Sequence, residues 1–217
     1  MFIFPNSSCF NFIKSPSSAI IRDIYDLRSS GPATTAFFYC DFRDDKKKDC
    51  RGLLSSLLVQ LCDQSNAYSA ILSDFYLEHG SGSQYTSNRE LLRCLQNMIQ
   101  LPGQSRLYIT IDALDECTTT TGLPSPREEV LDLVKDLVGL QVPNLWICVT
   151  SRPEADIEAV LGPLAFRSIS LHGESGQAKD IAEYIKFVVS TDPKMRGWRE
   201  ADKELVIEEL TRRADGM

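Results

Sequence analysis

The chain has 217 residues, a net charge of −7 and a pI of about 4.9. This acidic balance argues against nucleic acid as the main partner, because binding a phosphate backbone requires clustered Lys and Arg. Hydrophobic residues make up 43% of the chain and charged residues 24%, as in ordinary globular proteins. The length suits one domain with a small appendage.

The cysteines indicate a reducing, cytoplasmic location. There are seven of them, an odd number, and none forms a C-x-x-C pair. Cys40, Cys62 and Cys148 lie in apolar runs, where a reduced thiol behaves as a small hydrophobe. Only two histidines accompany them, which disfavours a zinc site. We expect no membrane partner, because no stretch approaches the roughly 20 apolar residues that span a bilayer.

Strand and helix patterns alternate along the chain. Nearly continuous apolar or β-forming runs predict buried parallel strands at residues 35–42, 107–112 and 145–150, with a weaker strand at 166–171. Amphipathic spacing predicts helices around residues 20–27, 53–61, 71–75, 91–99, 130–138, 181–188 and 205–210. This alternation implies βαβ units, and therefore an α/β fold with a parallel sheet flanked by helices in three layers.

Three regions follow from these patterns. Residues 1–16 form an atypical N-terminal segment, in which only residues 2–4 are strand-like. Residues 17–172 contain the strands and form the α/β core. Beyond about residue 173 only helices are expected, so residues 173–217 are interpreted as the start of a helical appendage that stops abruptly.

The strongest motif is the acidic end of the second buried strand. The strand delivers Asp112 at its carboxyl end, and Asp115 and Glu116 follow closely. In open α/β sheets, ligands bind at this edge, where a carboxylate can hold Mg²⁺ and a second acid can activate water. Small Ala113 allows the backbone to turn there. The alternative is a plain acidic turn in which Asp112 caps the next segment.

Arg152 follows the next buried strand, so we expect it at the same edge of the sheet. A guanidinium there could contact a γ-phosphate. The alternative is structural. Ser151 and Glu154 have the spacing of a helix capping box, and Pro153 suits a first helical turn.

A recognisable phosphate-binding loop is missing. Such a loop needs G-x-x-x-x-G-K-[S/T], in which glycines let backbone N–H groups surround the phosphates. Lys14-Ser15 is the only Lys followed by Ser or Thr, and it precedes a predicted helix. Ile13 and Ser8 stand where the glycines belong, and a β-branched residue resists positive φ. An ordinary N-terminal segment is the favoured interpretation, with a degenerate remnant next and a working cradle last.

Four stretches resemble the NACHT group of STAND P-loop NTPases, and most closely the nephrocystin 3-like N-terminal domains of fungal NLR-type proteins. They are residues 18–24 (SAIIRDI), 37–44 (FFYCDFRD), 111–117 (IDALDEC) and 150–154 (TSRPE). The resemblance implies a P-loop NTPase-like fold. It also implies a switch that binds ATP or GTP with Mg²⁺ and controls self-association or the binding of protein partners.

The resemblance also assigns roles by position. Asp112 matches the magnesium acid, Asp115 and Glu116 the catalytic acids, and Arg152 the phosphate sensor. Lys14 and Ser15 match the loop Lys and Ser only in type and order, because the glycines of the family's loop are absent. NTPase ancestry is therefore implied, but turnover by the chain as written is not expected.

Three interpretations of function remain open. The first is a nucleotide-binding signalling module of an NLR-like protein, impaired in nucleotide binding. The second is a nucleotide-free protein-interaction or scaffold domain. The third is an incomplete product of a larger NLR-like protein, in which a wrongly assigned start replaces the loop. The first depends on one geometric prediction, that Asp112 and Arg152 lie side by side on one rim of a parallel sheet.

Overall fold

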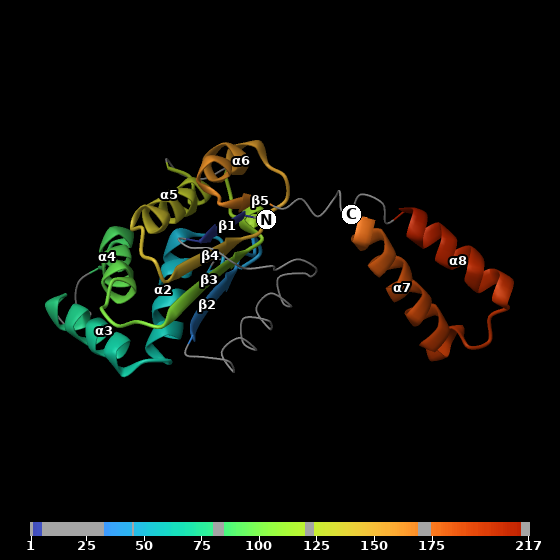
Figure 1. Ribbon diagram of the computed structural model, residues 1–217, viewed down its shortest axis with the longest axis horizontal. Coiled ribbons are helices and arrows are strands. Elements are labelled where there is room, and N and C mark those ends of the chain that lie inside the picture. The colour runs from blue at the N-terminus through green and yellow to red at the C-terminus, as the bar shows by residue number, and fades with distance from the viewer. Residues whose placement is uncertain are drawn as a thin grey trace. The chain divides into compact units, whose positions relative to one another are not determined.

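The computed structural model describes residues 2–5, 33–44, 46–79, 85–119, 124–168 and 175–213. The chain divides into two compact units, residues 1–168 and residues 169–217. Figure 1 shows the sheet with helices α2 to α6 in the first unit and helices α7 and α8 in the second.

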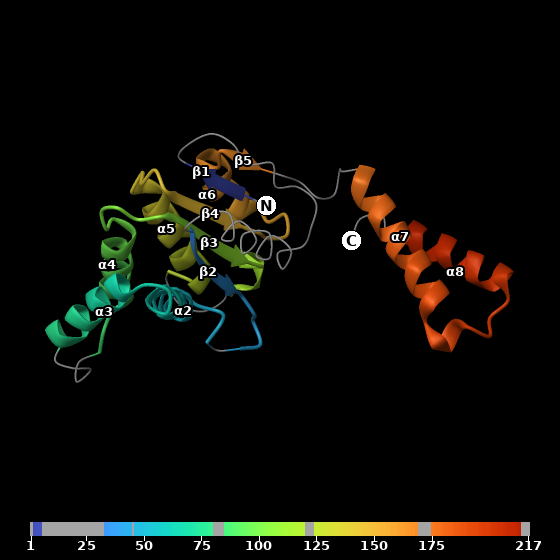
Figure 2. The same ribbon diagram turned by 60° about the horizontal axis from the view of Figure 1, so that its bottom comes forward.

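The first unit is built on a five-stranded sheet with the order β2-β3-β4-β1-β5. Strands β2 (Ala33–Tyr39), β3 (Arg106–Asp112) and β4 (Leu145–Val149) run parallel to one another (Figure 2). They confirm the three predicted buried strands. The weaker predicted strand is represented by β5 (Arg167–Ser168).

Strand β1 (Phe2–Pro5) runs antiparallel to both of its neighbours, β4 and β5. Phe2 pairs with Val149 at the end of β4, and Pro5 pairs with Trp146 near its start. The chain therefore leaves β1 at the edge of the sheet where the parallel strands begin. The parallel arrangement predicted for the three buried strands is confirmed, and β1, for which no direction was predicted, is antiparallel.

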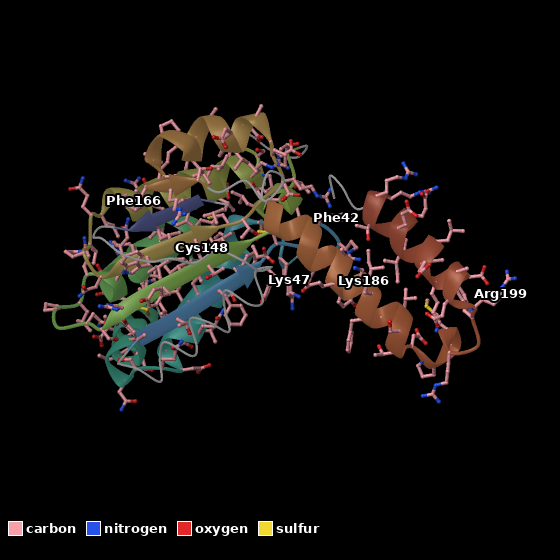
Figure 3. The ribbon with its side chains drawn as sticks, turned by 45° about the vertical axis from the view of Figure 1, so that its right-hand side comes forward. Phe42, Lys47, Cys148, Phe166, Lys186 and Arg199 are labelled. Atoms are coloured by element: carbon pink, nitrogen blue, oxygen red, sulfur yellow. The ribbon has the colours of Figure 1, made fainter. Side chains whose placement is uncertain are left out.

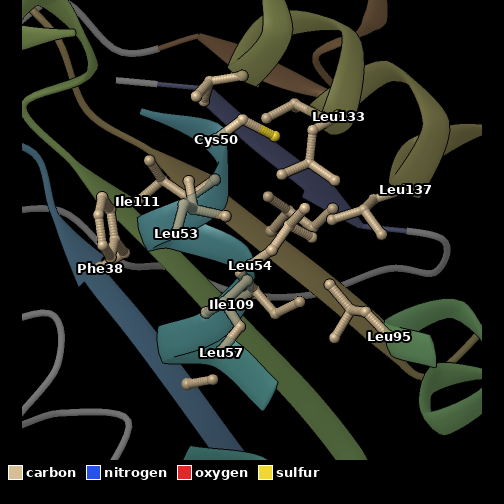
Figure 4. Packing of buried hydrophobic residues seen from close by; sticks show 14 of the residues in the cluster. Phe38, Cys50, Leu53, Leu54, Leu57, Leu95, Ile109, Ile111, Leu133 and Leu137 are labelled. Atoms are coloured by element: carbon tan, nitrogen blue, oxygen red, sulfur yellow. The ribbon is translucent and has the colours of Figure 1, made fainter. Parts of the chain in front are cut away.

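Leucine-rich helix faces form the main core with one face of the sheet. The helices that contribute are α2 (Cys50–Cys62), α4 (Asn88–Ile99), α5 (Pro126–Gly139) and α6 (Ala155–Leu161). Helix α3 (Asn66–Glu78) packs against α2 and α4. Figure 4 shows Leu53 and Leu57 of α2 close to Ile109 and Ile111 of β3. This packing agrees with the amphipathic spacing in the sequence.

The opposite face of the sheet is apolar as well. Tyr108 of β3 and Trp146 of β4 are both buried there, with ring centroids 6.3 Å apart. Strand side chains alternate between the two faces, so a sheet that is apolar on both faces needs cover on both. The parallel strands and flanking helices are consistent with the predicted three-layer αβα fold.

The side chains of Gln60, in helix α2, and Gln64, in the turn just after it, pair with the backbone of strand β2. Gln60 accepts from the Phe37 N–H at 3.0 Å and donates to the Phe37 carbonyl at 2.7 Å. Gln64 does the same at Thr35, at 3.1 and 2.7 Å. The two glutamines are four residues apart in sequence, and their amides match alternate residues of the strand. They therefore satisfy backbone groups that an edge strand otherwise leaves open.

The second unit contains helices α7 (Ser175–Thr191) and α8 (Glu200–Arg213), joined through a 3₁₀ turn at Pro193–Met195. The two helices pack against each other. Figure 3 labels Lys186 on α7 and Arg199 just before α8. The predicted helical character of this part is confirmed. Among the described helices, none is both long and apolar enough to cross a bilayer.

Candidate functional site

Asp112 lies where strands β3 and β4 end side by side. Ile111 pairs with Val149, so Asp112 and Thr150 are the next residues along two adjacent parallel strands. The Thr150 hydroxyl donates to Asp112 Oδ1 and accepts from the Ala113 N–H at 3.1 Å. The strands that precede Asp112 and Arg152 are therefore adjacent and parallel, as predicted. The carboxylate is also held in place by the neighbouring strand.

The chain reverses sharply after Asp112. Ala113 has φ 55° and ψ 47°, a left-handed conformation that costs a non-glycine residue about 1–2 kcal/mol. The short 3₁₀ helix η1 (Leu114–Glu116) follows. Its first residue, Leu114, is fully buried, and its N–H donates to the Thr150 carbonyl at 2.9 Å. The packing of Leu114 and this hydrogen bond hold the turn against the end of β4.

Residues 112–117 form a turn, called the acidic turn below. Asp115 connects this turn to the segment that follows β4. Its Oδ1 accepts from the Arg152 N–H at 2.9 Å, and its Oδ2 lies 3.5 Å from Arg152 Nε. The Asp115 side chain is only 9% exposed, whereas the Arg152 side chain is 79% exposed. The structure therefore brings the two predicted residues together as an ion pair, with the guanidinium facing solvent.

The capping box considered for residues 151–154 does not form, although Arg152 is exposed shortly before a helix. Helix α6 begins at Ala155, with Glu154 as its N-cap residue and no side-chain capping bond. Ser151 and Pro153 lie before the helix, outside regular secondary structure. The Arg152 N–H instead donates to Asp115, which holds this segment against the acidic turn.

Glu116 and the end of β2 complete the rim. The Phe42 N–H donates to Glu116 Oε2 at 3.4 Å, and the Cys40 N–H donates to the Asp112 carbonyl at 2.9 Å. Figure 3 labels Phe42 and Lys47 in the segment between β2 and α2. The carboxyl ends of β2, β3 and β4 are therefore all connected through the acidic turn.

Arg127 is a site residue that the sequence analysis missed. Its Nε donates to the Cys117 carbonyl at 3.1 Å, and its Nη2 donates to the Asp115 carbonyl. Its Nη1 lies 3.2 Å from Asp156 Oδ2, and only 11% of the side chain is exposed. The guanidinium therefore supports both ends of the acidic turn from the first turn of α5. The nearest sequence signal is the capping box Ser125–Glu128, which brackets Arg127.

Two buried thiols lie beneath the acidic turn. The Cys40 and Cys117 sulfurs are 3.5 Å apart and hydrogen-bonded, and both side chains are buried. The hydrogen bond between the two thiols lowers the pKa of Cys117, and the charge of Arg127 adds to this effect. The same hydrogen bond, together with burial, raises the pKa of Cys40.

The remaining predicted residues concern phosphate and metal binding. Lys14 and Ser15 lie outside the described residues. Within the described part of the chain, no three His, Cys, Asp or Glu side chains converge as a protein-only metal site. Mg²⁺ bound with phosphates needs only one or two carboxylates, since phosphate oxygens and water supply the other ligands. Half-buried Asp112, at the carboxyl edge of the sheet, fits that requirement.

Comparisons with known proteins give a family and a relative. The family model described as "Nephrocystin 3, N-terminal" matches residues 14–152, a range that includes Lys14, the acidic turn and Arg152. The vegetative incompatibility protein HET-E-1 of Podospora anserina is 29% identical over 153 residues, which is 68% of this chain and 11% of that protein. No solved structure gives a significant match.

The match to HET-E-1 supports the predicted likeness to fungal NLR-type proteins. The chain spans only about a tenth of that relative's length. The family model covers well over half of the chain. The chain therefore belongs to the nephrocystin 3 N-terminal family.

Proposed function

We propose that this chain is the nucleotide-responsive domain of an NLR-like signalling protein. It binds Mg²⁺ with ATP or GTP more weakly than a domain with a complete glycine loop, and its nucleotide state biases self-association or partner binding. The observation that carries this proposal is the shared edge of β3 and β4, where Asp112 and Arg152 follow adjacent parallel strands. Acid and guanidinium together at the carboxyl edge suit a metal-bound phosphate.

The Arg152–Asp115 ion pair does not prevent Arg152 from binding a phosphate. The contact between Arg152 Nε and Asp115 Oδ2 is long, at 3.5 Å, and 79% of the Arg152 side chain is exposed, so the guanidinium remains accessible. A charge-assisted hydrogen bond contributes about 1.5–3 kcal/mol, and guanidinium–phosphate contacts are often bidentate. A phosphate therefore competes successfully for the guanidinium, while Asp115 keeps the Arg152 N–H.

The contacts of the three acidic residues at this edge indicate a different role for each. Asp112 would hold Mg²⁺, which supplies charge neutralisation for the phosphates when it is bound. Asp115 positions Arg152 and the turn through its contacts with the Arg152 backbone. Glu116 is the remaining acid at the rim. The proposal covers binding and not turnover.

The missing loop glycines set the expected affinity. Each charge-assisted hydrogen bond that the loop fails to supply removes about 1.5–3 kcal/mol. Losing a few of these carries a micromolar complex toward the millimolar range. We therefore place the dissociation constant between about 10 μM and 1 mM.

Titration of the purified chain with a fluorescent ATP analogue in Mg²⁺ tests this proposal. Wild type should saturate in the stated range, and Asp112→Asn and Arg152→Ala should each weaken binding about tenfold or more, equivalent to about 1.4 kcal/mol. Arg199→Ala is the matched control, because Arg199 forms an exposed ion pair with Asp202 in the second unit. Absence of saturation at millimolar nucleotide rules the proposal out.

One observation favours a second function, a nucleotide-free interaction domain. Because β1 is antiparallel to β4, the chain leaves it at the edge opposite Asp112. A phosphate loop follows a strand that ends at the ligand edge. This alternative predicts no nucleotide binding together with retained self-association, which sedimentation of the nucleotide-free chain measures.

A further inference from the structure

Cys40 and Cys117 form a close thiol pair that the nucleotide proposal does not use. Their sulfurs are 3.5 Å apart although the residues are 77 positions apart in the chain. Their side chains are 4% and 1% exposed. A disulfide needs a sulfur separation of about 2 Å, so the two sulfurs must approach by roughly 1.5 Å and turn into the bonding geometry.

The two cysteines lie at the ends of two different elements of the rim. Cys40 directly follows β2, and its N–H donates to the Asp112 carbonyl. Cys117 directly follows η1, and its carbonyl accepts from Arg127 Nε. A bond between the two sulfurs would tie the end of β2 to the far end of the acidic turn. The charge of Arg127 favours a thiolate at Cys117, the form that reacts with oxidants.

We propose that Cys40 and Cys117 are a redox modification site, in which a peroxide converts the thiol pair into a reversible disulfide. The oxidant is a small peroxide because larger disulfide reagents do not fit beside two buried sulfurs. Access requires a local opening of the acidic turn, a short segment at the rim of the sheet. The inference is independent of nucleotide binding.

The reaction balances with hydrogen peroxide alone. The Cys117 thiolate attacks one peroxide oxygen and breaks the O–O bond, which gives a sulfenic acid and hydroxide. The Cys40 sulfur then attacks the sulfenic sulfur, the S–S bond forms, and the sulfenic oxygen leaves as water. Overall the two thiols lose two electrons and two protons, and the peroxide becomes two waters. A dithiol reductant reverses the change.

The other cysteines provide internal comparisons. Cys50, Cys62, Cys94 and Cys148 are free as well, and Cys94 is buried to the same degree as Cys117. Burial raises the pKa of Cys94 to about 11, which disfavours its reactive form. Selective loss of Cys40 and Cys117 therefore reports the pair and not general oxidation of buried thiols.

Peptide mapping of the folded chain tests the proposal. The protein is treated with hydrogen peroxide, its free thiols are alkylated under denaturing conditions, and it is digested without reductant. We expect a peptide cross-linked through Cys40 and Cys117 that disappears after treatment with dithiothreitol. The Cys94→Ala variant should give the same cross-link. Protein unfolded in urea before oxidation should lose the selectivity, because the two residues are then far apart.

Three results would overturn the inference. One is recovery of both thiols fully alkylated after peroxide treatment. Another is a Cys117 disulfide with any other cysteine. The third is conversion of Cys117 to sulfinic acid in wild type without a cross-link. The Cys40→Ala variant is expected to give this irreversible product, since it lacks the second thiol. These readouts use wild type as the primary sample, so they do not depend on a variant folding.

Discussion

The residues at the acidic turn differ in how readily they can be predicted from the sequence. Asp112 and Arg152 are found easily, because each follows a nearly continuous apolar run and parallel strands present their ends at one edge. Arg127 is not found, because its partners are the Asp115 and Cys117 carbonyls. Every residue has a backbone carbonyl, so the sequence does not indicate which carbonyls Arg127 contacts. These contacts are defined only once the turn has formed.

Arg127 should therefore matter for stability beyond its charge. Arg127→Ala leaves two turn carbonyls without their donors and should lower the free energy of unfolding by about 2–4 kcal/mol. Arg127→Lys should recover only part of this loss, because an ammonium cannot reproduce the fork geometry. Urea titration followed by circular dichroism measures both changes. The exposed Arg89→Ala variant should stay within about 0.5 kcal/mol of wild type, and an equal loss there would contradict the account.

Helices and strands were predicted correctly where the hydrophobic pattern of the sequence is strong. Continuous apolar runs located β2, β3 and β4, and leucine spacing located α2, α4 and α5. The direction of β1 and the glutamine pairing at β2 were not predictable, because both depend on which segments become neighbours. Helix α6 shows the same limit, since local spacing suggested a capping box at residues 151–154, whereas the helix begins at Ala155 and Arg152 contacts Asp115.

The glutamine pairs at β2 should protect the edge of the sheet. Gln64→Ala removes a donor and an acceptor that serve Thr35, at a cost of about 1–3 kcal/mol. Unpaired edge groups also promote association between sheets, so heating should produce more aggregate. Light scattering during thermal unfolding measures this effect. Gln96→Ala on helix α4 is the control, and similar aggregation of both variants would contradict the assigned role.

The start of helix α4 should be sensitive to acid. Hydrogen bonds from the Ser87 hydroxyl and N–H lower the pKa of Glu90 to about 2, from a usual value of 4.5. A lowered folded-state pKa contributes stability above the unfolded value and loses it as pH falls toward the folded value. The stability difference between wild type and Glu90→Gln should therefore shrink between about pH 5 and pH 2.

Urea titrations across that pH range measure the difference. Glu78→Gln, at the exposed end of helix α3, is the control for general charge effects. A Glu90→Gln difference that does not change with pH would show that the ionised carboxylate is not what stabilises the start of α4.

At the scale of the whole molecule, family membership and one edge of the sheet bear on the same proposed function. The chain belongs to the nephrocystin 3 N-terminal family, and the acidic turn connects the ends of β2, β3 and β4. The sequence predicted this edge because its two motifs follow adjacent strands. The nucleotide response remains our proposal, and it depends on Asp112 acting through Mg²⁺.

The most direct test is the Mg²⁺ dependence of nucleotide binding in wild type and Asp112→Asn. If Asp112 holds the metal, chelating Mg²⁺ should weaken ATP binding by wild type about tenfold or more, corresponding to about 1.4 kcal/mol. The same treatment should leave the residual binding of Asp112→Asn nearly unchanged. Equal Mg²⁺ dependence in the two proteins, or no binding by wild type at millimolar ATP, would contradict the account.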